Sequence, residues 1–184
     1  MIPILIVVAI VVVLALFLIG LYNRFVQLRN RIDNAWAQLD VQLRRRYDLI
    51  PTLVETVKGY AAHEMETLER VIQARAAGVS ARSVQEQAQA ENMITQALRQ
   101  LLAVAEAYPE LQASRNFLQL QEDLTDTEDK ISAARRYYNA TVMRFNTGVQ
   151  TIPWLLVARP LGFRAREFFS AEGDTSVPQV SLAT

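Results

Sequence analysis

The first 22 residues form one apolar stretch, and the chain after it shows the hydrophobic periodicity of α-helices. Residues 1–22 contain no charged side chain, and only Pro3 and Gly20 among them are not apolar. At about 1.5 Å per residue, a helix of this length crosses a hydrocarbon core of about 30 Å. A cleaved signal peptide would need basic residues before the run, a shorter apolar core and a small-residue cleavage site, all of which are missing. We therefore expect residues 1–22 to be a retained transmembrane anchor.

Two helices are predicted in the next 55 or so residues from apolar side chains three and four positions apart. The first continues out of the membrane and is expected to stop near residues 48–50, because Pro51 disfavours helical geometry in the residue before it. The second begins at Pro51 and runs to about Ala77, with Gly78 as its C-terminal stop. Their expected buried side chains are Phe25, Leu28, Ile32, Ala35, Leu39, Leu53, Val57, Tyr60, Leu68 and Val71.

Two further helices complete the predicted bundle. Residues 83–86 have the form of a capping box, so the third helix begins there and runs to about Ala107. A single helix over residues 109–150 would be about 60 Å long, which exceeds the other helices, so we expect a bend or a separate first turn before Phe117. From there on, a coiled-coil-like seam indicates core. The seam comprises Phe117, Leu120, Leu124, Thr127, Ile131, Ala134, Tyr138, Thr141 and Phe145.

The predicted fold is therefore all-α, with an N-terminal transmembrane helix that continues into an antiparallel four-helix bundle over residues 23–150. Short connections make neighbouring helices antiparallel, so the fourth helix returns to the bilayer.

A segment rich in aromatic residues and arginines, residues 151–169, follows the fourth helix. Rings at headgroup depth and arginines facing anionic lipid are typical of an interfacial segment, but the same residues could instead cap the bundle. Both alternatives are open. Residues 170–184 are small and polar and predict a flexible tail. The candidate membrane-interface residues are Tyr22, Arg24, Trp154, Arg159, Phe163, Arg164, Arg166, Phe168 and Phe169.

The distribution of charge predicts the orientation in the membrane. The chain has 19 Lys and Arg against 19 Asp and Glu, which argues against nucleic-acid binding because such proteins carry a basic excess. Arg24, Arg29 and Arg31 follow the apolar run, and no basic side chain precedes it. Positive charge tends to stay in the cytoplasm, so the N-terminus is expected outside and the bundle inside.

Residues suited to catalysis or metal binding are sparse. Cysteine is absent, and the single histidine begins His63-Glu64 without the second histidine of the zinc motif HExxH. On the predicted second helix this is a surface polar pair. The acidic run over residues 122–129 lies mostly off the seam and is expected to be a solvated face that pairs in part with the three arginines at the membrane-distal end of the first helix. We predict no catalytic residue, metal or cofactor. The candidate partner-surface residues are Arg44, Arg45, Arg46, His63 and Glu64.

Several sequence stretches together form a specific pattern. They include residues 45–64 (RRYDLIPTLVETVKGYAAHE), 34–36 (NAW), 108–111 (YPEL) and 137–140 (YYNA). Over about residues 20–170 the chain resembles the LemA family of bacterial membrane proteins. The resemblance implies an anchored four-helix bundle in the bacterial inner membrane. Some relatives carry a lipobox cysteine and face the periplasm, and its absence here favours a cytoplasmic bundle.

The resemblance implies no established enzymatic activity. It implies a membrane-associated scaffold or signalling component, with a membrane metalloprotease or another membrane protein as a partner. Our leading hypothesis is a non-enzymatic, single-pass membrane protein that acts through protein contacts. The alternative is a homo-oligomer that shapes the bilayer, and a carboxylate-bridged metal enzyme is the least favoured.

Overall fold

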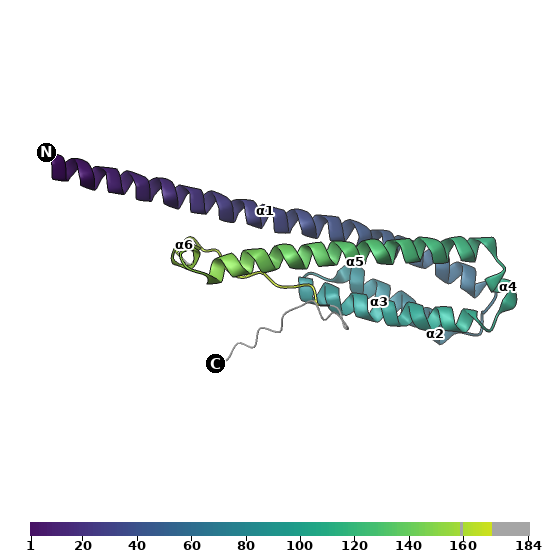
Figure 1. The fold of residues 1–184 in the computed structure, drawn as a ribbon. Helices are drawn as coiled ribbons and strands as arrows, with labels where there is room; N and C mark the ends of the chain where they lie inside the picture. The colour runs from purple at the N-terminus through teal and green to yellow at the C-terminus, as the bar shows by residue number, and fades with distance from the viewer. Residues whose placement is uncertain (159, 171–184) are drawn as a thin grey trace.

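Four long helices run alternately away from and back toward the apolar N-terminal end of the molecule (Figure 1). The structure is a computed structural model that describes residues 1–158 and 160–170. This part of the chain is helical without strands, as predicted. The helices are α1 (Ile2–Lys58), α2 (Met65–Ser80), α3 (Val84–Ala105), α4 (Pro109–Gln112), α5 (Arg115–Gln150) and α6 (Trp154–Ala158).

The core forms where α1 packs along α5, α2 packs along α3, and α1 joins the two pairs by contacting α2. Every predicted seam position of α5 is buried except Ala134, which is half-buried. The predicted stripe of α1 is likewise buried from Phe25 to Leu39, with Leu28 half-buried. Heptad spacing therefore identified the core face of both central helices.

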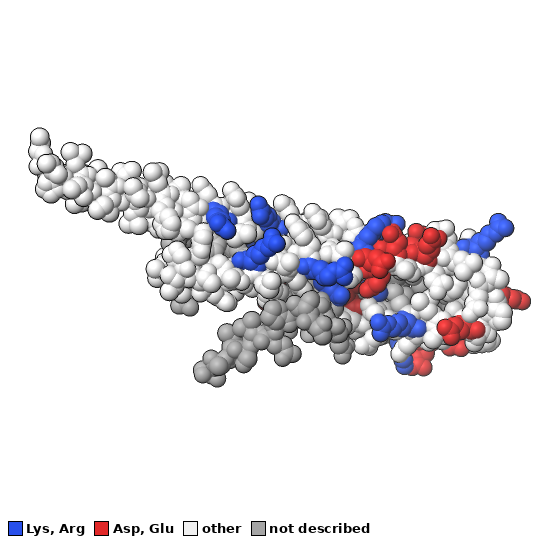
Figure 2. Space-filling model, in the orientation of Figure 1, with Lys and Arg blue, Asp and Glu red and all other residues white. Residues whose placement is uncertain are grey.

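Residues 2–20 of α1 project beyond the bundle, and all of them are exposed (Figure 1). Figure 2 shows that this arm carries no charged side chain and that basic side chains gather where it meets the bundle. Leu21 is the first buried residue. Within the described residues, α1 is the one helix long and apolar enough to cross a membrane, so the arm is a candidate span.

The predicted break at Pro51 is wrong, because α1 continues through it to Lys58. A proline has no N–H, so the carbonyl four residues earlier, that of Tyr47, loses its helical partner. Arg75 of α2 replaces that partner and donates its Nε–H to the Tyr47 oxygen at 2.7 Å. The chain instead turns at residues 59–64, which leaves Tyr60 exposed where we expected it buried.

Gly78 does not stop α2, which continues to Ser80. A Cβ atom at this position would lie 2.7 Å from the Tyr47 hydroxyl and 3.2 Å from Cδ1 of Ile94. The glycine is therefore needed for the close approach of Tyr47 to α2, and not for a left-handed cap.

Two predicted boundaries are confirmed. Ser83 caps α3, with its Oγ accepting the N–H of Glu86 at 3.1 Å. The Glu86 carboxylate accepts from the N–H of Arg82, one residue before the cap, and not from the cap itself. The short α4 and the break before α5 provide the separate first turn expected ahead of Phe117.

Candidate functional site

An aromatic cluster lies where the apolar arm of α1 enters the bundle. The ring of Phe25 stacks on Phe163, with centroids 5.0 Å apart, and meets the edges of Phe145 and Trp154 at 6.0 Å. Tyr22 contacts Phe163 at 5.9 Å. Aromatic pairs of this kind each contribute about 0.5–1.5 kcal/mol beyond their buried area. We call these five residues the aromatic collar, and they fix the C-terminal segment against the base of the arm.

Arg24 is held beside this collar. Its guanidinium carbon lies 4.9 Å from the centroid of Trp154, a cation–π contact, while the side chain stays exposed. The stacking orients a positive charge two residues beyond the uncharged run.

Two asparagines of α5 hold the extended segment that follows the collar. Asn139 accepts the N–H of Phe169 at 2.9 Å and donates to its carbonyl at 3.0 Å. Asn146 makes the same pair of bonds to Arg166, at 2.8 and 2.9 Å. We call these four bonds the asparagine clasp. The clasp was not predicted from the sequence, although two asparagines seven residues apart beside an apolar seam were a usable indication.

The collar and clasp revise the membrane-interface predictions. Phe163 and Phe169 are 7% and 0% exposed, so their rings lie inside the bundle and cannot reach lipid. For these two residues the bundle-capping alternative fits and the interfacial one is wrong. Phe168 is half-buried against the core.

The remaining interface candidates have different surroundings. Tyr22 and Arg164 are exposed, and Trp154 is half-buried. Arg166 is exposed and pairs with Asp33 at 3.3 Å. Arg159 lies outside the described residues.

Three aliphatic side chains that the sequence analysis did not single out protrude at the same end. Ile152 is 76% exposed, Leu156 69% and Leu161 47%. Leu156 belongs to α6, and the other two lie on either side of this helix in the sequence. Helix α6 lies beside α1 near the end of the apolar arm (Figure 1). The segment thus turns its rings inward and its aliphatic side chains outward.

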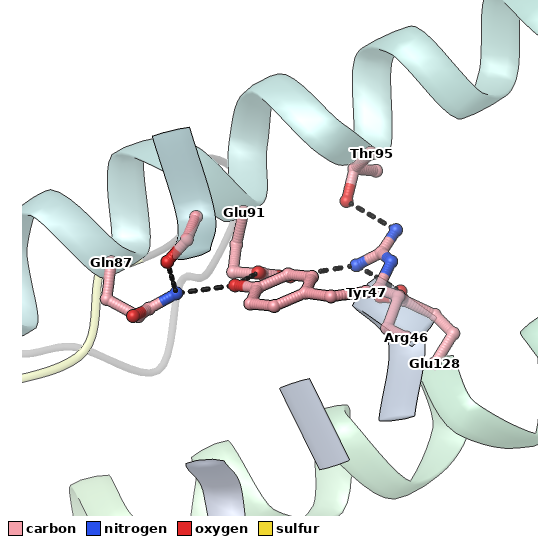
Figure 3. A network of polar contacts seen from close by, with 7 residues as sticks. Arg46, Tyr47, Gln87, Glu91, Thr95 and Glu128 are labelled. Atoms are coloured by element: carbon pink, nitrogen blue, oxygen red, sulfur yellow. Dashed lines mark hydrogen bonds and ion pairs between the residues drawn. The ribbon is translucent and has the colours of Figure 1, made fainter. Parts of the chain in front are cut away.

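The other notable cluster is a buried polar network between α1, α3 and α5 (Figure 3). Arg46 is 5% exposed and donates to Glu91 at 3.1 Å and to Thr95 at 3.2 Å. It also pairs with Glu128 at 2.9 Å. Tyr47 donates its hydroxyl to the other oxygen of Glu91.

Burial controls ionisation in this network. Loss of solvent raises the pKa of Glu91 although the neighbouring Arg46 lowers it, and burial beside Glu91 raises the pKa of Tyr47. Gln87 donates to the Tyr47 hydroxyl, so that oxygen is both donor and acceptor. The Tyr47 hydroxyl and both terminal nitrogens of Arg46 bond to protein partners, which is the arrangement of a structural element.

Arg46 is therefore not part of a partner surface, and that prediction is wrong. Arg44 and Arg45 are exposed and pair with Asp40 at 2.9 Å and with Asp126 at 3.7 Å. The expected pairing of the acidic run with these arginines is present. All three arginines lie about three turns before the end of α1, because the helix passes Pro51.

His63 and Glu64 lie in the turn between α1 and α2, and not on a helix as predicted. His63 is exposed, and Glu64 accepts a bond from the Tyr108 hydroxyl at 3.4 Å. Across the described residues, no three His, Cys, Asp or Glu side chains are grouped so that they could hold a metal ion.

The chain is similar in sequence to several bacterial proteins. It is similar to magnetosome protein MamQ of Magnetospirillum gryphiswaldense, with 24% identity over 86% of the chain and 70% of the relative. Magnetosome protein MamQ 2 of Paramagnetospirillum magneticum is 27% identical over 85% of the chain and 68% of the relative. Protein LemA of Metamycoplasma hominis is 29% identical over 86% of the chain and 75% of the relative. The model of the LemA family matches residues 35–182, which cover most of the bundle, the clasp and the buried network, and the chain accordingly belongs to the LemA family.

Proposed function

We propose that this chain is a single-pass protein of the bacterial inner membrane whose bundle acts as a non-enzymatic scaffold or adaptor for other membrane proteins. The observation that carries the proposal is the continuity of α1, a single helix of 57 residues. Its exposed apolar arm and its core stripe belong to one rigid element, so insertion of the arm would fix the bundle at the membrane surface.

The outward aliphatic side chains support a second contact with the bilayer. Ile152, Leu156 and Leu161 are exposed beside the end of the candidate span, at the depth where apolar side chains enter the interface. Arg24 and Arg164, both exposed, lie near them and suit anionic headgroups. The collar and clasp would hold this surface at a fixed angle to the arm.

The arginines after the apolar run favour an external N-terminus and a cytoplasmic bundle. The absence of cysteine from the sequence permits a clean test. In intact cells, a membrane-impermeant maleimide is expected to label Ile2→Cys and to label Ala133→Cys only after lysis. The reverse pattern would contradict the orientation, and release of the chain by carbonate extraction would contradict the anchor.

The membrane-distal end is the surface best suited to protein partners. Tyr60, Met65 and Leu118 lie at or next to the turns of that end with their side chains about half exposed. His63 lies in the same turn as Tyr60. A mixed apolar and polar surface of this kind is typical of transient protein contacts.

Photo-crosslinking in native membranes tests the scaffold. With p-benzoylphenylalanine in place of Tyr60 or Leu118, we expect adducts with one recurring foreign membrane protein, a membrane metalloprotease included, identified by mass spectrometry. The same probe in place of Tyr137, exposed on the flank of α5, is the control and should give none. Equal adducts at all three positions, or substrate turnover by the purified protein, would overturn the proposal.

Self-assembly is a second candidate because α2 carries an exposed apolar stripe. Met65, Ile72 and Val79 recur every seven residues on its outer face, each about half exposed. Heptad spacing is what a helix–helix seam requires. If a second copy packs here, Ile72→Glu should convert nanodisc-bound oligomers to monomers, whereas Val41→Glu, exposed on α1, should not. A wild-type monomer at high concentration would exclude this candidate.

A further inference from the structure

A groove with three arginines runs along α1 and α5 directly below the apolar arm. It has a volume of about 760 Å³ and extends from Gly20, two residues before the end of the uncharged run, to Arg31. Arg24 and Arg31 from α1 and Arg144 from α5 supply its charge. We call it the basic groove, and its other polar lining residues are Asn23, Gln27 and Thr147.

Among the described residues, no acidic side chain neutralises the positive charge of the basic groove. No carboxylate lines it, and across residues 1–158 and 160–170 none of the three arginines forms an ion pair. The aromatic collar pre-orients Arg24, since Trp154 holds its guanidinium by stacking. Three arginines that line one groove without acidic partners among the described residues suit an anion, because guanidinium groups bind phosphate through charge-assisted hydrogen bonds.

The depth of the groove selects the anion. If the arm spans the hydrocarbon core, Arg24 lies about 6 Å beyond Gly20 along the helix and Arg31 about 16 Å. The headgroup layer of one leaflet is about 5–8 Å thick, so the mouth of the groove opens into it. Met143 and Leu28 provide an apolar wall suited to the glycerol end of a lipid, and the amides of Asn23 and Gln27 suit hydroxyl groups.

We infer that the basic groove binds the headgroup of an anionic phospholipid, with its phosphate held by Arg24 and Arg144 near the mouth and Arg31 at the deeper end of the headgroup site. The inference rests on the proposed function in one respect, that α1 spans the bilayer. It adds a specific lipid site to what would otherwise be general attraction of basic residues to a negative surface.

The chain offers a matched control for general attraction. Arg29 lies between Arg24 and Arg31 in the sequence and is exposed, but it does not line the groove. Arg29→Gln therefore removes the same charge at the same depth without altering the site.

The test uses the full chain in nanodiscs of phosphatidylcholine with a minor fraction of phosphatidylglycerol. Lipid retained after gentle detergent release is counted by native mass spectrometry. We expect wild-type protein to retain phosphatidylglycerol in preference to phosphatidylcholine. Arg31→Gln and Arg144→Gln should each lower retention about fivefold, and Arg29→Gln should leave it unchanged.

The inference would be overturned by equal retention of the two lipids, by an equal loss with Arg29→Gln, or by displacement of the lipid by inorganic phosphate. An acidic protein segment copurifying in its place would also overturn it. Carbonate extraction of each variant separates this failure from failure of the proposed function, because the substitutions leave the arm unchanged. A chain that stays in the membrane without retaining lipid refutes the lipid site alone.

Discussion

Arg75 on α2 donates its Nε–H to the carbonyl oxygen of Tyr47 on α1, 28 positions earlier in the chain, at 2.7 Å. That carbonyl has no partner within its own helix because Pro51 carries no N–H. A side chain from one helix thus completes the backbone hydrogen bonding of another, and α1 passes through a proline without ending.

This bond predicts coupling between Arg75 and Pro51. Arg75→Ala leaves the Tyr47 carbonyl unsatisfied, so we expect the free energy of unfolding to fall by about 1–3 kcal/mol. In the Pro51→Ala background the new N–H can bond to the same carbonyl, and Arg75→Ala should then cost less than about 1 kcal/mol. Urea unfolding in mild detergent, followed by circular dichroism, measures both. Additive effects would show that the two residues act independently.

A second prediction concerns Gly78. A Cβ atom would lie 2.7 Å from the Tyr47 hydroxyl oxygen and 2.8 Å from its ring carbon, so Gly78→Ala forces Tyr47 away from Gln87 and Glu91. We expect a loss of about 1–3 kcal/mol in unfolding free energy, the usual effect of overpacking. Gly59→Ala is the control, because its Cβ would meet only ordinary contacts, the nearest at 3.4 Å. Equal stability of the two variants would contradict this assignment.

Arg44 and Arg46, from the run of three consecutive arginines, are predicted to differ sharply in how much they contribute to the stability of the fold. Arg46→Ala leaves the carboxylates of Glu91 and Glu128 without their cation, so we expect a loss of about 3–5 kcal/mol. Arg44→Ala breaks only an exposed pair with Asp40 and should change stability by less than about 0.5 kcal/mol. Thermal unfolding in detergent distinguishes them, and similar losses for the two would refute the buried role of Arg46.

The burial of Arg46 could have been predicted from the spacing of apolar residues along α1. Ending the first helix at Pro51 made the arginines a helix terminus, whereas continuing the three-and-four spacing from Leu39 through Leu43 leads to Arg46 and then Ile50. The spacing alone therefore carried the information that Arg46 faces inward. What concealed it was the rule for proline, which holds only when no distant side chain replaces the missing hydrogen bond.

Other features could not be predicted from local pattern. The seam of α5, the cap at Ser83 and the break before Phe117 depend on residues close in the sequence, and these predictions are confirmed. The clasp joins Asn139 to Phe169, 30 positions later in a segment without regular structure. The spacing of the two asparagines could have identified them as a pair, but no periodicity identifies the residues that they bind. Aromatic residues near a membrane can either pack against the bundle or contact lipid. Only the packing around Phe25 shows that Phe163 does the former.

Alkaline pH is predicted to destabilise the bundle in a defined window. Burial raises the pKa of Tyr138 to about 12, while the unfolded chain releases that proton near 10. Between these values the folded state holds more protons than the unfolded state, so stability falls as the pH rises. Tyr47 acts in the same direction. Tyr138→Phe should reduce the slope of unfolding free energy against pH by up to about 1.4 kcal/mol per pH unit, measured by urea unfolding from pH 9 to 11.5. An unchanged slope would contradict it.

The asparagine clasp is expected to control whether the C-terminal segment stays on the bundle. Asn146→Ala removes both bonds to the backbone of Arg166, and Asn139→Ala removes both to Phe169. We expect faster hydrogen exchange at the two bonded amides, and a loss of about 1–3 kcal/mol for the buried Asn139.

Exposed Asn116, near the start of the same helix, gives the matched control Asn116→Ala, which should alter neither quantity. The two clasp variants should also release the aliphatic surface of Ile152 and Leu156 from its fixed angle to the arm, since the segment that seats Phe163 on Phe25 is tethered through the clasp. Limited proteolysis near residues 160–170 would then rise in both variants. Protection equal to that of the wild type would mean that the aromatic collar alone holds the segment and that the clasp adds nothing.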